Sequence, residues 1–176
     1  FFALGLGKSR GRPAAVITTS GTAGANLFPS VIEASQGDVP LLVLTADRPH
    51  RLRDADGNQA MDQIRLFGTF PRAFFEVELP RLHGSALRHL RSLPARAVSA
   101  AMGPPPGPVH LNFPFEKPLE PPDVAGTPSE AGALEELQQE DPLAAVGRPR
   151  GDPFVRTLPT TRRASEEELH RLASIL

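Results

Sequence analysis

The sequence predicts an α/β fold built on a parallel sheet, and three observations support this prediction. Residues 14–19 and 41–44 are short apolar runs, bounded by glycine, proline or polar residues, as in buried strands. Between them, from Thr22 onward, apolar residues recur at the spacing of one helix face. A strand, a helix and a strand in so short a stretch form a βαβ unit, so the two strands should be parallel.

The first helices of the chain carry boundary signals. Residues 1–7 are apolar, and we interpret them as the end of a helix that begins upstream, in a longer protein of which this chain is a piece, truncated at its N-terminus. Ser20 or Thr22 is expected to cap the helix that follows the first strand. Pro29 lies inside that helix and predicts a kink or a short first segment, and Gly37 should end it.

The middle of the chain alternates further helical and extended segments. Charged residues enter the segment after Phe74, so we expect any strand there to lie near an edge of the sheet. The expected elements, in order, are a polar loop over 48–61, a short helix over 61–67, a strand over 74–79, a pair of helices between 87 and 101 broken near Pro94, and a strand over 108–113.

Composition changes after Pro118. Residues 119–163 are rich in proline, glycine, glutamate, alanine and arginine without a sustained apolar period, so we expect an extended, partly disordered linker. Ser165 followed by Glu168 is a capping-box pattern that predicts a helix. The expected parts are therefore a domain over 1–118, a linker over 119–163, and the first helix of a central domain over 164–176.

Composition and charge exclude several classes of protein. The net charge is −1, which gives no electrostatic basis for binding nucleic acid or an acidic membrane surface. No apolar run approaches the ~18 residues of a membrane span. The chain has no cysteine, which rules out disulfides and thiolate zinc sites and fits a reducing compartment.

Small polar residues follow the first predicted strand. Ligands of open α/β sheets bind at the carboxyl ends of the strands, where backbone N–H groups at the start of a helix can meet a ligand. Glycine there allows a ring or a phosphate to approach the backbone closely. An ordinary capped turn is the alternative interpretation. The candidate ligand-binding residues are Ser20, Gly21, Thr22, Ala23 and Asn26.

Arg48 follows the second predicted strand and precedes a proline that stiffens the loop. An arginine fork in this place can bind a carboxylate through two hydrogen bonds, and Asp47 could orient it. The alternative is a local Asp47–Arg48 pair or a solvated loop, and we interpret Arg51 and Arg53 in the same way, as locally paired or solvated loop residues.

Other polar residues have weaker signals. Asn58 and Gln59 could hydrogen-bond a ligand carboxylate or carbonyl, although loop amides more often satisfy backbone turns. His110 lies in a predicted strand and is expected to be a hydrogen-bonded structural residue. Glu76 and Glu78 share one face of a predicted strand, and a solvated face is the expected explanation.

Residues 1–118 resemble the MenD family, the 2-succinyl-5-enolpyruvyl-6-hydroxy-3-cyclohexene-1-carboxylate synthases, which use thiamine diphosphate in menaquinone and phylloquinone synthesis. The most family-specific stretch is TADRP at 45–49 followed by NQ at 58–59. Further similarity covers FALGLGK at 2–8, the VITTSGTA stretch at 16–23 and GPVHLN at 107–112.

The resemblance implies a pyrimidine-binding domain, in which a parallel sheet wrapped by helices binds the aminopyrimidine end of thiamine diphosphate at a subunit interface of a homo-oligomer. Such enzymes decarboxylate 2-oxoglutarate and add the product carbanion to isochorismate. The resemblance places Arg48 on a substrate carboxylate and Gln59, with Asn58, on substrate polar groups. The cofactor side would comprise Ser20, Gly21, Thr22, Ala23 and Asn26.

The resemblance also implies what lies outside these residues. The family's activating glutamate would precede Phe1, and the diphosphate and its Mg²⁺ or Mn²⁺ would be held by a separate domain. We therefore expect no catalytic or metal-binding residue within the 176 residues, and no synthase activity from them alone. The family further implies a cytoplasmic bacterial protein, or a plastid protein in a photosynthetic eukaryote.

Two other functions remain open. One is another thiamine-diphosphate 2-oxoacid decarboxylase or synthase, similar to acetohydroxyacid synthase. The other is a non-catalytic binding domain that keeps the surface of a pyrimidine-binding domain. The choice between menaquinone and phylloquinone as the end product also stays open.

Overall fold

The computed structural model describes residues 1–117, 119, 128–158, 161 and 163–176. Its centre is a four-stranded sheet in which every neighbouring pair is parallel, in the order β1-β2-β4-β3. The predicted α/β fold with a parallel sheet is confirmed. The strands are β1 (Ala14–Thr18), β2 (Leu41–Asp47), β3 (Ala73–Glu76) and β4 (Pro108–Pro114).

Strand β4 is one of the two inner strands of this sheet, and it carries polar residues. It pairs with β2 from Leu41↔Pro108 to Asp47↔Pro114 and with β3 on its other side. Its side chains are buried on both faces, so the polar residues His110 and Asn112 lie inside the protein. Strand β3 lies at the sheet edge, as expected from its charges, but it ends three residues earlier than expected.

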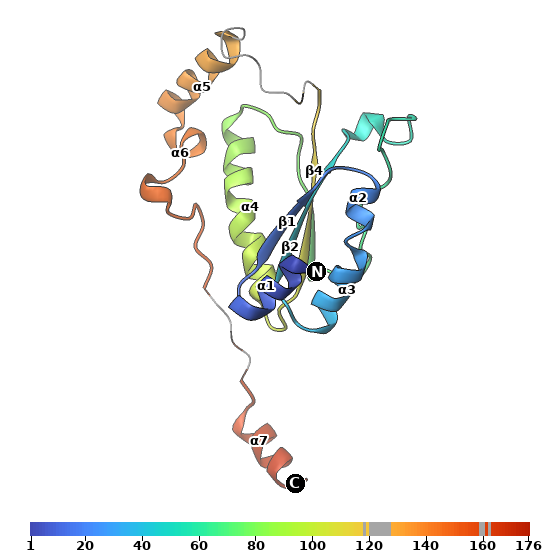
Figure 1. The fold of residues 1–176 in the computed structure, drawn as a ribbon. Coiled ribbons are helices and arrows are strands. Elements are labelled where there is room, and N and C mark those ends of the chain that lie inside the picture. Colours follow the sequence, from blue (N-terminus) through green and yellow to red (C-terminus); the bar gives the residue numbers. More distant parts are fainter. Residues whose placement is uncertain (118, 120–127, 159–160, 162) are drawn as a thin grey trace.

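One face of the sheet is covered by α2 (Thr22–Ala25) and α3 (Phe28–Gln36), seen on one side of the strands in Figure 1. The break before Pro29 confirms the expected short first segment, and Gly37 ends α3. Helix α1 (Phe2–Arg10) packs into the same apolar cluster as α3, and Gly11 caps its end.

The opposite face is covered by α4 (Gly84–Met102). This is one continuous helix, so the expected pair of helices broken at Pro94 is wrong. Leu93, Ala97 and Ala101 form one buried stripe against β4, and this packing spans the proline. Pro94 itself faces solvent, where its ring and its missing N–H disturb the packing least.

Residues 61–63 are irregular and residues 64–69 form turns, so the expected short helix over 61–67 is also wrong. Arg65 has a left-handed backbone, with φ of 52°, which a continuous right-handed helix cannot contain. Gln63, just before it, is fully buried and takes its side chain into the sheet. This tertiary contact replaces helical hydrogen bonding in the segment.

The described part of the expected linker contains α5 (Pro128–Glu140), α6 (Pro142–Ala145) and the 3₁₀ turn η2 (Pro149–Gly151), so the expected extended conformation is wrong there. Arg88 donates two hydrogen bonds to the Asp141 carboxylate, and Arg91 donates to the carbonyls of Ala144 and Ala145. These polar contacts with α4 order a sequence that lacks an apolar stripe. The linker prediction for 118, 120–127, 159–160 and 162 lies outside the described residues.

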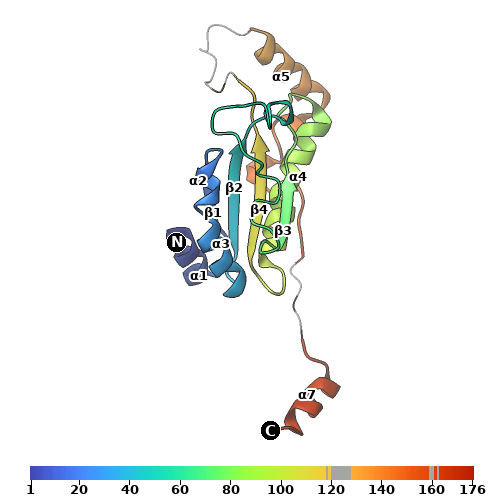
Figure 2. The ribbon, with the colours of Figure 1, turned by 90° about the vertical axis from the view of Figure 1, so that its right-hand side faces the viewer.

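Helix α7 (Glu166–Ala173) begins with the expected capping box, because Ser165 and Glu168 hydrogen-bond each other's backbone N–H. It lies away from the sheet in both views (Figures 1 and 2). Among the described residues, no helix is both long and apolar enough to cross a membrane. The boundaries at 118 and 163 remain a prediction.

Candidate functional site

The candidate residues gather at the carboxyl ends of β1 and β2. Figure 2 shows the loop that follows β2, in teal, crossing the upper ends of β2 and β4 beside α2. The loop contains the 3₁₀ turn η1 (His50–Leu52) and continues to β3. Thr45 to Asp47 lie inside β2 rather than beyond it, so Arg48 is the first residue after the strand.

The turn after β1 has an unusual hydrogen-bonding arrangement. Gly21, with φ of 79°, occupies the N-cap of α2, and no side chain caps this helix, so the expected cap by Ser20 or Thr22 is wrong. Gly21 N instead donates to Gln63 Oε1 over 2.7 Å. Ser20 is 2% exposed, and its Oγ has no hydrogen-bond partner within the described part of the chain.

The loop around Gln59 closes onto this turn. A Cβ placed on Gly21 would lie 3.0 Å from the Gln59 carbonyl oxygen, closer than side chains normally approach. Gln59 itself has a left-handed backbone, with φ of 55°. Its side chain and that of Asn58 are exposed, as are Thr22 and Asn26, while Ala23 is half-buried.

Arg48 is held by the same loop. Its Nε and Nη2 donate to the Asn58 carbonyl oxygen over 3.3 and 3.0 Å. The Arg48 side chain therefore contacts the backbone of Asn58 and not its side-chain amide. Both residues line a cavity of about 360 Å³, which Lys117 and Phe115 also border.

Asp47 does not orient the Arg48 fork, so that expectation is wrong. Its Oδ1 accepts the Arg48 backbone N–H, whereas Oδ2 accepts from Arg53 Nη2 over 2.8 Å and from Asn112 Nδ2 over 2.7 Å. The carboxylate is buried, and its ion-pair partner is Arg53.

Arg53 is not a solvated loop residue either. Its side chain is 12% exposed and pairs with both Asp47 and Glu76. Burial lowers the Arg53 pKa, but the hydrogen bond to Glu76 and the charge of Asp47 outweigh it and raise the pKa above its ordinary value. Arg51, by contrast, is an exposed residue paired with Glu116.

Glu76 is exposed, as expected for a solvated face, and it also accepts hydrogen bonds from two side chains. Its Oε2 accepts from Asn112 Nδ2 over 2.9 Å, and Oε1 accepts from Arg53. Glu78 lies beyond the end of β3 and is likewise exposed.

Sequence reasoning missed the two residues that join these groups, Asn112 and Gln63. Asn112 Oδ1 accepts from Thr45 Oγ1 over 2.8 Å and from Gln63 Nε2 over 2.9 Å. Gln63 Nε2 also donates to the Ala46 carbonyl over 2.9 Å. Asn112 could have been found from the sequence, because a polar residue within a predicted buried strand needs hydrogen-bond partners. Gln63 gave no such signal.

His110 is a hydrogen-bonded core residue, as expected. Its Nε2 lies 2.8 Å from Thr45 Oγ1, and its ring packs edge-on against Phe67 at 4.8 Å between centroids. Burial lowers the His110 pKa to about 4, although the charge of Asp47 acts in the opposite direction.

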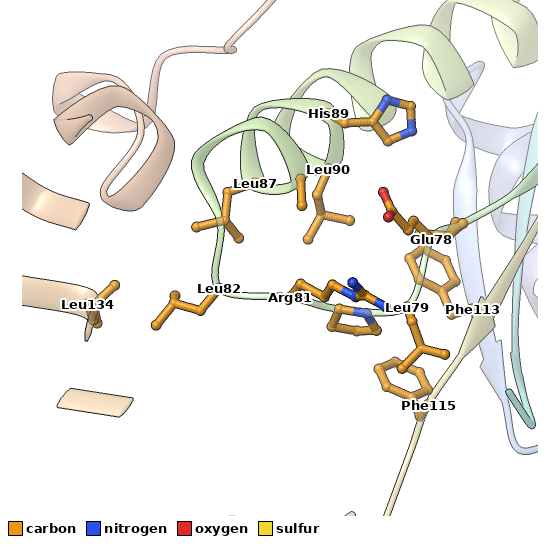
Figure 3. Close-up of a pocket in the computed structure, with 13 residues that line it drawn as sticks. Glu78, Leu79, Arg81, Leu82, Leu87, His89, Leu90, Phe113, Phe115 and Leu134 are labelled. Atoms are coloured by element: carbon orange, nitrogen blue, oxygen red, sulfur yellow. The ribbon is translucent and has the colours of Figure 1, made fainter. Parts of the chain in front are cut away.

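A second, apolar cavity of about 500 Å³ lies between the segment after β3, the start of α4 and the end of β4 (Figure 3). Leu79, Leu90 and Phe113 contribute to its lining, and none of the sequence-predicted site residues reaches it. Phe115 borders both this cavity and the one beside Arg48. Among the described residues, no group of three His, Asp or Glu side chains is arranged to hold a metal ion.

Comparison with known proteins places this geometry in context. Residues 1–66 match the family model described as "Thiamine pyrophosphate enzyme, N-terminal TPP binding domain". The chain is 47% identical over 174 residues to a protein of Halobacterium salinarum, covering 99% of this chain and 29% of the relative. It is 46% identical over 179 residues to a protein of Roseiflexus sp. strain RS-1, covering 100% of this chain and 29% of the relative.

A protein of Geobacillus kaustophilus is 53% identical over 121 residues, covering 69% of this chain and 21% of the relative. All three relatives carry the name 2-succinyl-5-enolpyruvyl-6-hydroxy-3-cyclohexene-1-carboxylate synthase. The chain thus spans less than a third of the length of these relatives.

Proposed function

Because this chain belongs to the 2-succinyl-5-enolpyruvyl-6-hydroxy-3-cyclohexene-1-carboxylate synthase family of thiamine-pyrophosphate enzymes, we propose that it is the pyrimidine-binding part of such a synthase. The full-length protein would decarboxylate 2-oxoglutarate and join the product to isochorismate. The observation that carries the proposal is the 47% identity over 99% of the chain. The meeting of the Gly21 turn with the Arg48 loop supports it.

The residues of the Gly21 turn fit the polar edge of an aminopyrimidine. Ser20 Oγ is buried and has no partner among the residues that the structure describes, and a buried hydroxyl without a hydrogen bond is costly. The missing Cβ of Gly21 allows the Gln59 carbonyl to lie against the turn, which brings the loop that contains Asn58 and Gln59 beside these residues. The residues proposed to hold the pyrimidine end of thiamine diphosphate are Ser20, Gly21, Thr22, Ala23 and Asn26.

Thiamine diphosphate, when bound, supplies the electron sink for decarboxylation of a 2-oxoacid. This chain would orient the pyrimidine end and exclude water around it. The diphosphate of the cofactor and a Mg²⁺ or Mn²⁺ ion would be held elsewhere in the full-length protein, at an interface between subunits of a homo-oligomer.

Arg48 is the proposed substrate residue. The hydrogen bonds to the Asn58 carbonyl fix the guanidinium beside a cavity of about 360 Å³. A fixed guanidinium suits carboxylate binding, and both proposed substrates carry carboxylates. The exposed amides of Asn58 and Gln59 would bind further polar groups of the substrate.

The test uses the full-length protein that contains this chain, supplied with thiamine diphosphate, Mg²⁺, 2-oxoglutarate and isochorismate. We expect CO₂ release and formation of the coupled product, and no turnover from residues 1–176 alone. Use of pyruvate with no use of isochorismate would favour an acetohydroxyacid synthase-like enzyme. Cofactor binding without turnover would favour a non-catalytic binding domain.

A further inference from the structure

The cofactor-facing turn and the arginine loop are joined by one buried hydrogen-bond network. It starts at Gly21 N, which donates to Gln63, and passes from Gln63 Nε2 to Asn112 Oδ1. From Asn112 Nδ2 it continues to Asp47, and from Asp47 to Arg53 in the loop after β2.

The same loop returns to the starting point. Arg53 lies a few residues after Arg48, whose guanidinium binds the Asn58 carbonyl. The next residue, Gln59, places its own carbonyl against Gly21. These contacts, together with the stretch of chain between Arg48 and Gln59, close a ring that contains both halves of the candidate site.

The network admits only one arrangement of its central amide. Asn112 uses both amide hydrogens, on Asp47 and Glu76, and its oxygen accepts from Thr45 and Gln63. These bonds exhaust the amide's capacity. A reversed Asn112 amide would direct its oxygen at two carboxylates, so the charges of Asp47 and Glu76 determine which atom faces Gln63.

Gln63 is similarly constrained. Its oxygen accepts from Gly21 N, and its nitrogen donates to Asn112 Oδ1 and to the Ala46 carbonyl. Gln63 and Asn112 are both fully buried. The bonded donors of the two buried amides favour one rigid geometry, although Arg53 Nε, at the end of the network, has no partner within the described part of the chain.

We propose that Gln63, Asn112 and Arg53 are positioning residues, which hold the Gly21 turn and the Arg48 loop in one fixed relative placement. The inference rests on the proposed function, because it assigns cofactor to the turn and substrate carboxylate to the loop. None of the three needs to touch either ligand. A change at the Arg53 end therefore reaches the cofactor side through the network.

The test is the Arg53→Met variant of the full-length protein, which removes the network end farthest along the ring of bonds from Gly21. We expect hydrogen exchange at the Gly21 amide to become at least tenfold faster. We also expect the Kd for thiamine diphosphate and the KM for 2-oxoglutarate or isochorismate to rise together, each by about tenfold. Gln63→Met should change the exchange rate, Kd and KM in the same way. In the double variant, each fold-change should be smaller than the product of the two single-variant fold-changes.

Arg72→Met is the matched control. Arg72 is also a half-buried arginine, and it binds Ser35, Asp38 and the Pro106 carbonyl, outside the ring of bonds that contains Gly21. This variant should lower the melting temperature but leave Gly21 exchange, Kd and KM within twofold of the unchanged protein.

Unchanged Gly21 exchange in Arg53→Met would overturn the inference, as would equal acceleration by Arg72→Met, which signals general destabilisation. Failure of the proposed function looks different, because the unchanged protein would then neither bind thiamine diphosphate nor turn over. The exchange measurement still decides the positioning role in that case.

Discussion

The guanidinium of Arg48 donates two hydrogen bonds to the carbonyl oxygen of Asn58, ten residues further along the chain. This contact folds the loop after β2 back on itself and presents the arginine beside a cavity. The loop is stabilised from its other side by Arg53 and Asp47. Arg48 is therefore held by Asn58, which the sequence also identified, in a loop stabilised by Arg53, whose role the sequence did not reveal.

Replacing Arg48 should affect substrate more than cofactor. In the full-length protein, Arg48→Ala should raise the KM for the substrate whose carboxylate it binds, with a loss of about 2–5 kcal/mol in transition-state binding. The Kd for thiamine diphosphate should change by less than threefold, since the hydrogen-bonded path from Gly21 through Gln63 and Asn112 to Arg53 does not include Arg48. Steady-state kinetics and calorimetry measure the two effects.

Arg10→Ala serves as the control for this variant, because Arg10 is exposed at the end of α1. It should change neither constant. Substrate kinetics that stay normal in Arg48→Ala would remove Arg48 from the proposed site.

Gly21→Ala should be destabilising. The new Cβ would lie 3.0 Å from the Gln59 carbonyl oxygen, and a φ of 79° is readily adopted by glycine but disfavoured for L-residues such as alanine. We expect a loss of about 1–3 kcal/mol in stability and weaker binding of thiamine diphosphate, measured by denaturant unfolding and calorimetry.

Gly5→Ala is the opposite case and a matched control. Gly5 lies within α1, and a Cβ there would meet nothing within 4 Å. Alanine should stabilise the helix by about 0.5–1 kcal/mol. Equal effects of the two substitutions would show that the Gly21 turn is not tightly closed.

His110 should make the protein sensitive to acid. The native state holds the neutral imidazole, with a pKa of about 4, whereas the unfolded chain binds a proton near pH 6.5. Stability from this residue is therefore complete above pH 6.5 and is lost as the pH falls toward 4, by on the order of 3 kcal/mol. Unfolding free energies across this range measure the loss.

His110→Asn should flatten this part of the pH profile, whereas His89→Asn, at an exposed position of α4, should leave it unchanged. A profile identical in His110→Asn and the unchanged protein would exclude His110 as the source.

Pro94→Ala should stabilise α4. The helix continues through Pro94, which faces solvent, so alanine would restore one backbone N–H donor without disturbing the buried Leu93. We expect a gain of about 1–3 kcal/mol in unfolding free energy. A loss of stability would mean that the proline ring itself packs favourably.

The strands and the break in the first crossover helix were predictable because their signals are local. The apolar runs at β1 and β2, the position of Pro29 and the Ser165 capping box each lie within a few residues of the structure they specify. Arg48 and Gly21 were found in the same way, from their position after a strand.

The missed features all depend on distant partners. Arg53 is half-buried because it pairs with Asp47 of β2 and Glu76 of β3, and Gln63 bonds Gly21 across 42 residues of sequence. The order of α6 depends on Arg91 of α4, 53 residues away from the carbonyl it binds. Such pairings become visible only once the order of the strands is known.

The most direct measurement of the central proposal is the reaction of the full-length protein with 2-oxoglutarate and isochorismate. We expect CO₂ release and coupled product that both depend on thiamine diphosphate, with no reaction from residues 1–176 alone. Failure to release CO₂ from 2-oxoglutarate, or reaction with pyruvate while isochorismate is left unused, would contradict the proposed function.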